Sequence, residues 1–148
     1  MPSKVSLSTI GFTKKSAEEF FRLLGGAGVE RVIDVRLNNV SQLAGFAKKD
    51  DLQFFLRAVG GIEYLHLPQL APTQDLIDLA RKQKHWEEFG AGYLRLIRAR
   101  QVEKVVSRQL LDRACLLCSE DQPDHCHRRI LAEYLAGHFP GVQVSHLV

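Results

Sequence analysis

The side chains best suited to chemistry lie close together in the last third of the chain. Two thiols, a carboxylate, an imidazole and a guanidinium occur there in one short stretch. They belong to Cys118, Glu120, Cys126, His127 and Arg128. The stretch begins where the mostly apolar run 113–118 ends, and that run has the composition of a buried strand. Because α/β proteins place reactive groups where strands end and helices begin, this stretch is the strongest candidate site.

Cys126 is the candidate nucleophile. The last helix is expected from about residue 124 to residue 137, which places Cys126 in its first turn. The helix dipole there favours an anion, so the pKa of the thiol is expected below its usual value of about 8.5. His127 or Glu120 would accept the proton. The alternative is that Cys126 is a small buried hydrophobic residue.

A second set of charged residues follows the strand expected at residues 31–35. Arg36, together with Arg128, is expected to hold an anion through paired hydrogen bonds. Asp34 would orient Arg36 or act as a base. In the alternative, Arg128 forms a structural pair with Asp34 or Glu120. Three further ligand-binding candidates are expected on the same rim, namely Thr13, Ser41 and Cys118.

The Cys115-x-x-Cys118 spacing suggests zinc, but the geometry of a strand opposes it. Residues three apart on an extended strand point to opposite faces, so we expect Cys115 in the core and predict no metal. A site built from Cys118, Cys126, His127 and Glu120 stays open as an alternative. Cys118 and Cys126 could also form a redox couple if their Cα atoms lie within about 7 Å. The sequence does not identify a cofactor.

The elements that must position these residues alternate between strands and helices. Ser16, Asp50 and Thr73 are expected to cap helices. Trp86, Phe89 and Tyr93 recur at helical spacing and are expected in the core. Strands are expected at residues 5–10, 31–35, 62–67, 113–118 and 142–144.

This alternation predicts β-α-β units and therefore a mostly parallel sheet. The expected fold is α/β: a single three-layer domain over residues 1–148, with a five-stranded Rossmann-like sheet and helices on both faces. We expect the strand order 3-2-1-4-5. That order places the crevice between the strands that end at Ile10 and Cys118.

Composition sets limits on location and partners. The 148 residues carry a net charge of +3 and an isoelectric point near 8.9, which permits an anionic partner and gives only weak support to nucleic acid. Three cysteines, an odd number, favour free thiols in a reducing compartment. No apolar run is long enough to span a membrane, and we expect a cytoplasmic protein. The oligomeric state is not predicted.

The chain resembles the family catalogued as domain of unknown function 488. Segments that carry the resemblance are Thr9–Phe12, Ile33–Arg36 with Ser41, Gly61–Tyr64 with Leu67, Pro68 and Leu70, Phe46 with Leu52 and Leu56, and most specifically Leu116–Glu120 followed by Cys126–Arg128. Many relatives have a Gly-Gly pair where this chain has Ala71-Pro72, which puts a ligand role for that loop in doubt. The resemblance implies a compact α/β domain. It implies no particular activity. It also implies a functional role for seven residues: Asp34, Arg36, Cys118, Glu120, Cys126, His127 and Arg128.

Three hypotheses follow for function. In the first, the protein is an enzyme that acts on a small anionic ligand, such as a nucleotide or a phosphate compound, at the carboxyl edge of the sheet. In the second, it is a non-catalytic module that binds nucleic acid or protein through a basic rim. In the third, the polar cluster is a buried network that fixes the last helix to the sheet. The sequence leaves open whether the protein is an enzyme.

Overall fold

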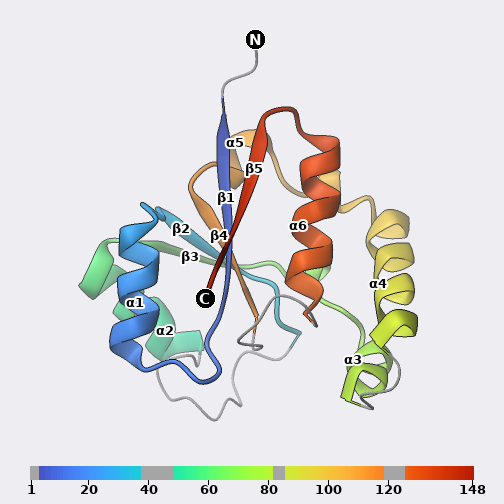
Figure 1. Cartoon of the computed structure of the whole chain (residues 1–148), viewed down its shortest axis with the longest axis horizontal. Helices are drawn as coiled ribbons and strands as arrows, with labels where there is room; N and C mark the ends of the chain where they lie inside the picture. The colour runs from blue at the N-terminus through green and yellow to red at the C-terminus, as the bar shows by residue number, and fades with distance from the viewer. Residues whose placement is uncertain (1–3, 38–48, 82–85, 119–125) are drawn as a thin grey trace.

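A five-stranded parallel sheet forms the centre of the protein (Figure 1). The computed structural model describes residues 4–37, 49–81, 86–118 and 126–148. The strands are β1 (Val5–Gly11), β2 (Arg31–Asp34), β3 (Glu63–His66), β4 (Ala114–Cys118) and β5 (Val142–Leu147). Every pairing between them is parallel. The predicted three-layer α/β, Rossmann-like fold is therefore confirmed.

The order of the strands differs from the expected 3-2-1-4-5 and is β3-β2-β4-β1-β5. The prediction placed β2 beside β1, as in one half of a Rossmann fold. Instead β4 lies between β1 and β2, and all five of its residues are buried. β1 and β4 are still neighbours, as predicted. Because β4 takes the place beside β2 that was expected for β1, the ends of β2 and β4 lie side by side, and Asp34 is in register with Leu117.

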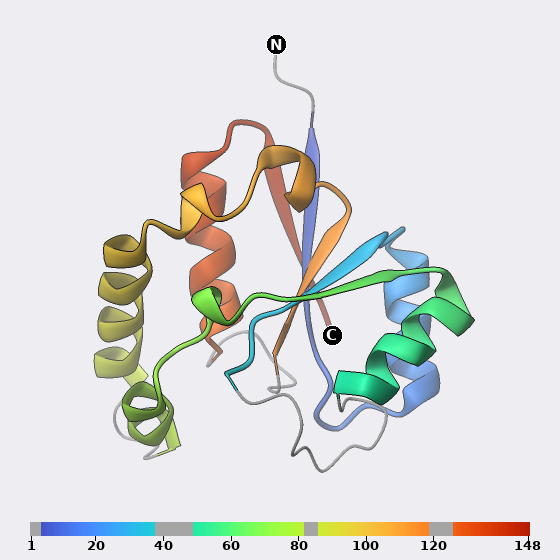
Figure 2. The ribbon, with the colours of Figure 1, turned by 180° about the vertical axis from the view of Figure 1, so that it is seen from behind.

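Helices cover both faces of the sheet (Figures 1 and 2). One face carries α1 (Ala17–Gly26) and α2 (Lys49–Phe55), the latter extended by a π-helical turn, η2 (Leu56–Gly60). The other face carries α3 (Gln74–Arg81), α4 (Trp86–Arg100) and α6 (His127–His138). Shorter helical segments complete the connections: η3 (Pro68–Leu70), η5 (Val102–Lys104) and α5 (Arg108–Leu111).

The predicted helix starts were right for two helices and wrong for two others. The Ser16 hydroxyl accepts a hydrogen bond from the Glu19 amide at 3.1 Å, and α1 begins at the next residue. Thr73 caps α3 in the same way. Asp50, however, lies inside α2 instead of capping it. Cys126 is the N-cap of α6, with extended backbone, and so precedes the first turn in which it was expected.

The side chains of β4 alternate between two hydrophobic cores. Leu116 and Cys118 belong to the core under α4 and α6. Cys115 and Leu117 belong to the core under α1 and α2. Cys115 and Cys118 therefore point to opposite faces, as predicted from strand geometry.

The aromatic residues of α4 also lie where they were expected. Phe89 and Tyr93 are buried, and Trp86 packs against the same core. Among the described helices, none combines the length and the apolar character needed to cross a membrane.

Candidate functional site

Cys118 and Cys126 are joined by a disulfide at the point where β4 ends and α6 begins. Their Cα atoms are 7.5 Å apart, slightly beyond the limit of about 7 Å set from the sequence. Free thiols were expected, but among the cysteines only Cys115 is free. Burial raises the pKa of the Cys115 thiol against the opposing effect of Arg128, which agrees with its predicted place in the core.

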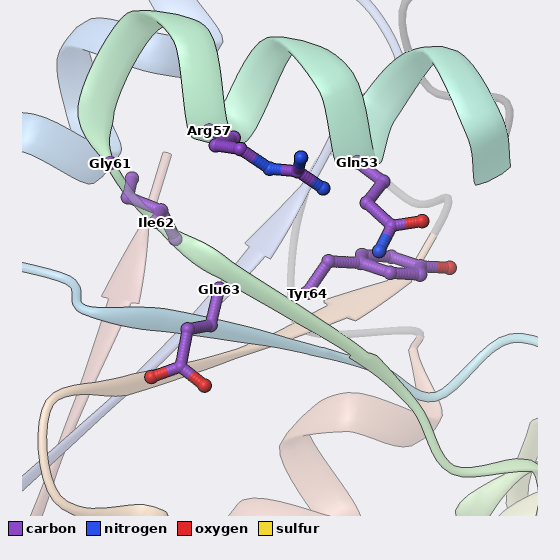
Figure 3. A pocket seen from close by; sticks show the side chains of 6 residues that line it. All are labelled: Gln53, Arg57, Gly61, Ile62, Glu63 and Tyr64. Atoms are coloured by element: carbon purple, nitrogen blue, oxygen red, sulfur yellow. The ribbon is translucent and has the colours of Figure 1, made fainter.

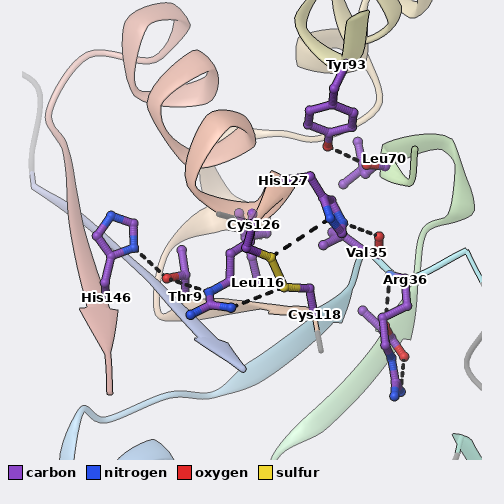
Figure 4. Close-up of a disulfide and its surroundings, with 12 residues drawn as sticks. Thr9, Val35, Arg36, Leu70, Tyr93, Leu116, Cys118, Cys126, His127 and His146 are labelled. Atoms are coloured by element: carbon purple, nitrogen blue, oxygen red, sulfur yellow. Dashed lines mark hydrogen bonds and ion pairs between the residues drawn. A yellow bond between two sulfur atoms is a disulfide. The ribbon is translucent and has the colours of Figure 1, made fainter. Parts of the chain in front are cut away.

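His127 lies between the sulfur atoms and the end of β2 (Figure 4). Its Nε2 atom is 2.8 Å from the carbonyl oxygen of Val35. A carbonyl oxygen can only accept, so Nε2 carries the proton and donates it. The Nδ1 atom then has a free lone pair, and it lies 4.0 Å from Cys126 Sγ.

The surroundings of His127 keep its ring neutral. Burial lowers the pKa of His127 to about 4, and the positive charge of Arg128 acts in the same direction. The Val35 carbonyl and the Asp34 carboxylate oppose this shift without reversing it. The ring of Tyr93 meets the imidazole edge-on, with 5.3 Å between ring centroids. His127 is therefore held as a neutral imidazole whose unprotonated nitrogen faces sulfur.

Arg128 is fully buried beside the disulfide. Its Nη1 donates to Cys118 Sγ at 3.2 Å, and its Nε donates to the Thr9 hydroxyl at 3.3 Å. The Thr9 Oγ1 atom also lies 2.6 Å from Nδ1 of His146. Parallel pairing of β1 with β5 sets Thr9 opposite His146 and so produces this contact. These contacts anchor the first turn of α6 to the central strands.

Asp34 and Arg36 form a second buried pair, here called the Asp34–Arg36 clamp. Arg36 donates to the Asp34 carboxylate from Nε at 2.8 Å and from Nη2 at 2.7 Å. The Arg36 amide and the Tyr64 hydroxyl donate to the same carboxylate at 3.1 and 2.5 Å. Four donors therefore surround Asp34, an arrangement that suits an orienting group better than a base. The Arg36 guanidinium also stacks over the ring of Phe12, 5.4 Å from its centroid.

One donor of the clamp is left over. The Arg36 side chain is almost fully buried, with a relative exposure of 4% for the residue. Its Nη1 atom finds no hydrogen-bond acceptor among the residues that the structure describes. Because an unsatisfied buried donor costs about 1–3 kcal/mol, this atom is the clearest sign of a missing acceptor.

Tyr64 connects the clamp to a pocket between α2, η2 and β3. The pocket has a volume of about 260 Å³. In Figure 3 the side chains of Gln53 and Arg57 extend from the helix toward Tyr64. Glu63 also lines the pocket, so its walls carry both signs of charge. Its volume is just below the range usual for drug-sized ligands, which suits a small ligand.

The sheet separates the predicted site residues into two groups. Val35 belongs to the core under α4 and α6, together with Cys118 and Cys126. Its neighbours Asp34 and Arg36 point to the other face, where Phe12 and Tyr64 lie. Figure 4 likewise shows the Arg36 side chain extending away from the sulfur atoms. The hydrogen bond from His127 to the Val35 carbonyl joins the two groups.

The remaining predicted residues are less informative. Thr13 is exposed in the turn that follows β1. Ser41 and Glu120 lie outside the described residues.

Sequence reasoning missed several members of the network. Phe12 and Tyr64 were not singled out as contacts of the clamp. His66 was interpreted as a satisfied structural histidine, and its Nε2 does donate to the Arg36 carbonyl at 2.8 Å. His146 was interpreted as peripheral, yet it contacts Thr9. No sequence signal singled out Thr9, because Ser6 and Ser8 are also polar residues of the same strand.

The comparisons with known proteins give one match. A family model described as "Domain of unknown function DUF488" matches residues 16–135. No curated protein and no solved structure matches the chain. The matched segment runs from the N-cap of α1 into α6 and includes both the clamp and the disulfide.

Proposed function

Starting from the chain's membership of the DUF488 family, which the match over residues 16–135 shows, we propose that the protein is an enzyme that acts on a small anionic ligand. The ligand is of the nucleotide or phosphate class and binds at the carboxyl edge of the sheet. The observation that carries this proposal is that Nη1 of the nearly buried Arg36 has no hydrogen-bond acceptor within the described segments. An anionic oxygen is the acceptor that this donor lacks.

The Asp34–Arg36 clamp is the ligand-holding part of the proposed site. Asp34 and the Phe12 ring fix the plane of the guanidinium, so little side-chain entropy is lost when an anion binds. Asp34 has the role of a positioning residue, because its carboxylate already accepts from four donors. Arg128 lies on the other face of the sheet and contributes positive charge close to the sulfur atoms.

The thiol and imidazole groups are the reactive part of the proposed site. In the dithiol form Cys126 is the nucleophile, and Nδ1 of His127, or Glu120, accepts its proton. The 4.0 Å approach of His127 Nδ1 to Cys126 Sγ supports the first of these pairings. Because the clamp and the sulfur atoms lie on opposite faces, the ligand would have to extend past the end of β2 to reach Cys126. The thiolate would attack the electrophilic centre of that part of the ligand, with departure of the group bonded there.

Isothermal titration tests the anion-binding step. Inorganic phosphate, pyrophosphate and AMP serve as probes, each titrated into wild type, Arg36→Lys and Arg129→Lys. Arg36→Lys keeps the positive charge but loses the paired N–H donors of the guanidinium. Binding should therefore weaken by about 10- to 100-fold, as expected for one charge-assisted hydrogen bond. Arg129→Lys is the matched control, because Arg129 is exposed and paired with Glu133.

Two results contradict the proposal. One is the absence of binding by all three probes. The other is equal binding by wild type and Arg36→Lys. Tight binding of an oligonucleotide with a steep salt dependence, together with no effect of Arg36→Lys, would instead favour the non-catalytic binding module.

A further inference from the structure

Three potential metal ligands converge beside the end of β2. The ligand atoms of Cys118, Cys126 and His127 all lie within 4.8 Å of one another. Cys118 comes from the last position of β4, and the other two residues come from the N-cap and first position of α6. Two sulfurs and one imidazole nitrogen form a ligand set that zinc uses in proteins.

The orientation of His127 is that of a metal ligand. A ligating histidine usually donates its second ring N–H to a backbone carbonyl or a carboxylate, which fixes its tautomer and direction. Here Nε2 donates to the Val35 carbonyl at 2.8 Å. The ligating nitrogen would be Nδ1, which lies 4.0 Å from Cys126 Sγ. The same pairing also orients a histidine that acts as a general base, so the convergence of the two sulfur atoms on Nδ1 is what points to a metal.

The sulfur atoms also have a supporting donor. Arg128 Nη1 lies 3.2 Å from Cys118 Sγ, and the residue is fully buried. Two thiolates and a divalent cation sum to zero charge, so the guanidinium can donate to a metal-bound sulfur without facing a second full positive charge. A hydrogen bond of this kind is what the outer shell of a thiolate site supplies.

We propose that, in the dithiol form of the protein, Cys118, Cys126 and His127 bind one zinc-type divalent cation as three of its ligands. No other residue that the structure describes belongs to this group. A dithiol reductant first transfers two electrons to the Cys118–Cys126 disulfide, and the reductant becomes a disulfide while two protein thiols form. Binding of the cation to the two sulfurs and to Nδ1 then releases two protons. The disulfide form binds no cation at this position, so oxidation and metal binding exclude each other.

The inference deepens the proposed function by naming a cofactor for the reactive part of the same site. Cys126 is the nucleophile of the proposed function only in the metal-free dithiol. Once a cation is bound, Cys126 is no longer a free nucleophile, and any coordination position left open would be the reactive one. Catalytic zinc sites have three protein ligands and structural zinc sites have four, and the described part of the chain supplies three here. Metal binding does not depend on the Asp34–Arg36 clamp.

Metal titration under anaerobic conditions tests the inference. The protein is reduced with dithiothreitol, freed of reductant by desalting and titrated with zinc chloride or cobalt chloride. We expect one metal ion per chain and, with cobalt, the visible bands of a tetrahedral site together with near-ultraviolet thiolate-to-cobalt absorption. Cys118→Ser, Cys126→Ser and His127→Ala should each weaken binding by at least about tenfold. Cys115→Ser is the matched control and should bind normally, because Cys115 faces the opposite core.

The oxidised wild type is a control that does not depend on the folding of any variant. It contains every ligand residue in the disulfide form and should take up no metal, and renewed reduction should restore uptake. Absence of metal uptake by the reduced wild type overturns the inference, and so does unchanged uptake by the two serine variants at positions 118 and 126. Phosphate titration of the same reduced, metal-free sample separates the two proposals. Phosphate binding without metal uptake would support the anion site and contradict the metal site. Metal uptake without phosphate binding would support the metal site and contradict the anion site.

Discussion

Nε2 of His127 lies 2.8 Å from the carbonyl oxygen of Val35, and this contact joins the last helix to the end of the second strand. The two residues are 92 positions apart in the sequence. Because the backbone fixes one ring nitrogen as a donor, the other faces the sulfur of Cys126. This hydrogen bond therefore fixes the tautomer of His127 and connects its imidazole to the end of β2, next to the Asp34–Arg36 clamp.

Asp34→Asn should destabilise the protein strongly. The variant removes the counter-charge that faces the nearly buried Arg36 guanidinium, and breaking a buried pair in this way costs about 3–5 kcal/mol. Urea unfolding measures the loss. Glu30→Gln is the control, because it breaks an exposed pair with Arg113, and it should cost no more than about 1 kcal/mol. Equal unfolding midpoints for the two variants would show that the clamp does not support the fold.

Thr9→Val should also destabilise the fold, although it preserves the shape of the side chain. The Thr9 hydroxyl accepts from the buried Arg128 and contacts His146, and the loss of these two contacts should cost about 1–3 kcal/mol. Thermal and urea unfolding would measure the change. Ser6→Ala, at an exposed position of the same strand, should change stability by less than about 0.5 kcal/mol. A Thr9→Val protein as stable as wild type would mean that the hydroxyl does not anchor α6.

Cys115 should resist alkylation in the folded, reduced protein. Its side chain is fully buried and its pKa is raised by burial, so both access and thiolate formation are suppressed. Iodoacetamide labelling followed by peptide mass spectrometry reports each cysteine separately. Guanidinium chloride should make Cys115 react freely. Rapid labelling of Cys115 without denaturant would contradict its place in the core.

Much of the fold was predictable from local patterns. Alternation along residues 114–118 predicts Cys115 in one core and Cys118 on the other face, and both lie there. The caps at Ser16 and Thr73 were predictable because capping depends on neighbouring residues. The strand order was not, because a continuous apolar run shows that a strand is buried but not which strands lie beside it. The position of β4 between β1 and β2 depends on packing across the whole sheet.

The carboxyl edge of the sheet was predictable as the place of the candidate site, but the arrangement of the residues there was not. The ends of β2 and β4 lie at the same edge, as the parallel sheet implied, but the direct pairing of these two strands was not predicted. The sequence placed Arg36 and Cys126 on one rim, but period-two alternation at Asp34, Val35 and Arg36 turns the clamp to the opposite face from the sulfurs. The partners of Arg128 could not be predicted, because Thr9 and His146 meet only through the register of β1 with β5.

The tautomer of His127 is the most direct test of the account. Long-range proton–nitrogen correlation spectra of nitrogen-15-labelled protein at neutral pH report which ring nitrogen carries the proton. The account predicts a neutral ring with the proton on Nε2 and an unprotonated Nδ1. A proton on Nδ1, or a ring that exchanges between both forms, would contradict the account, because the lone pair would then not face the sulfur atoms.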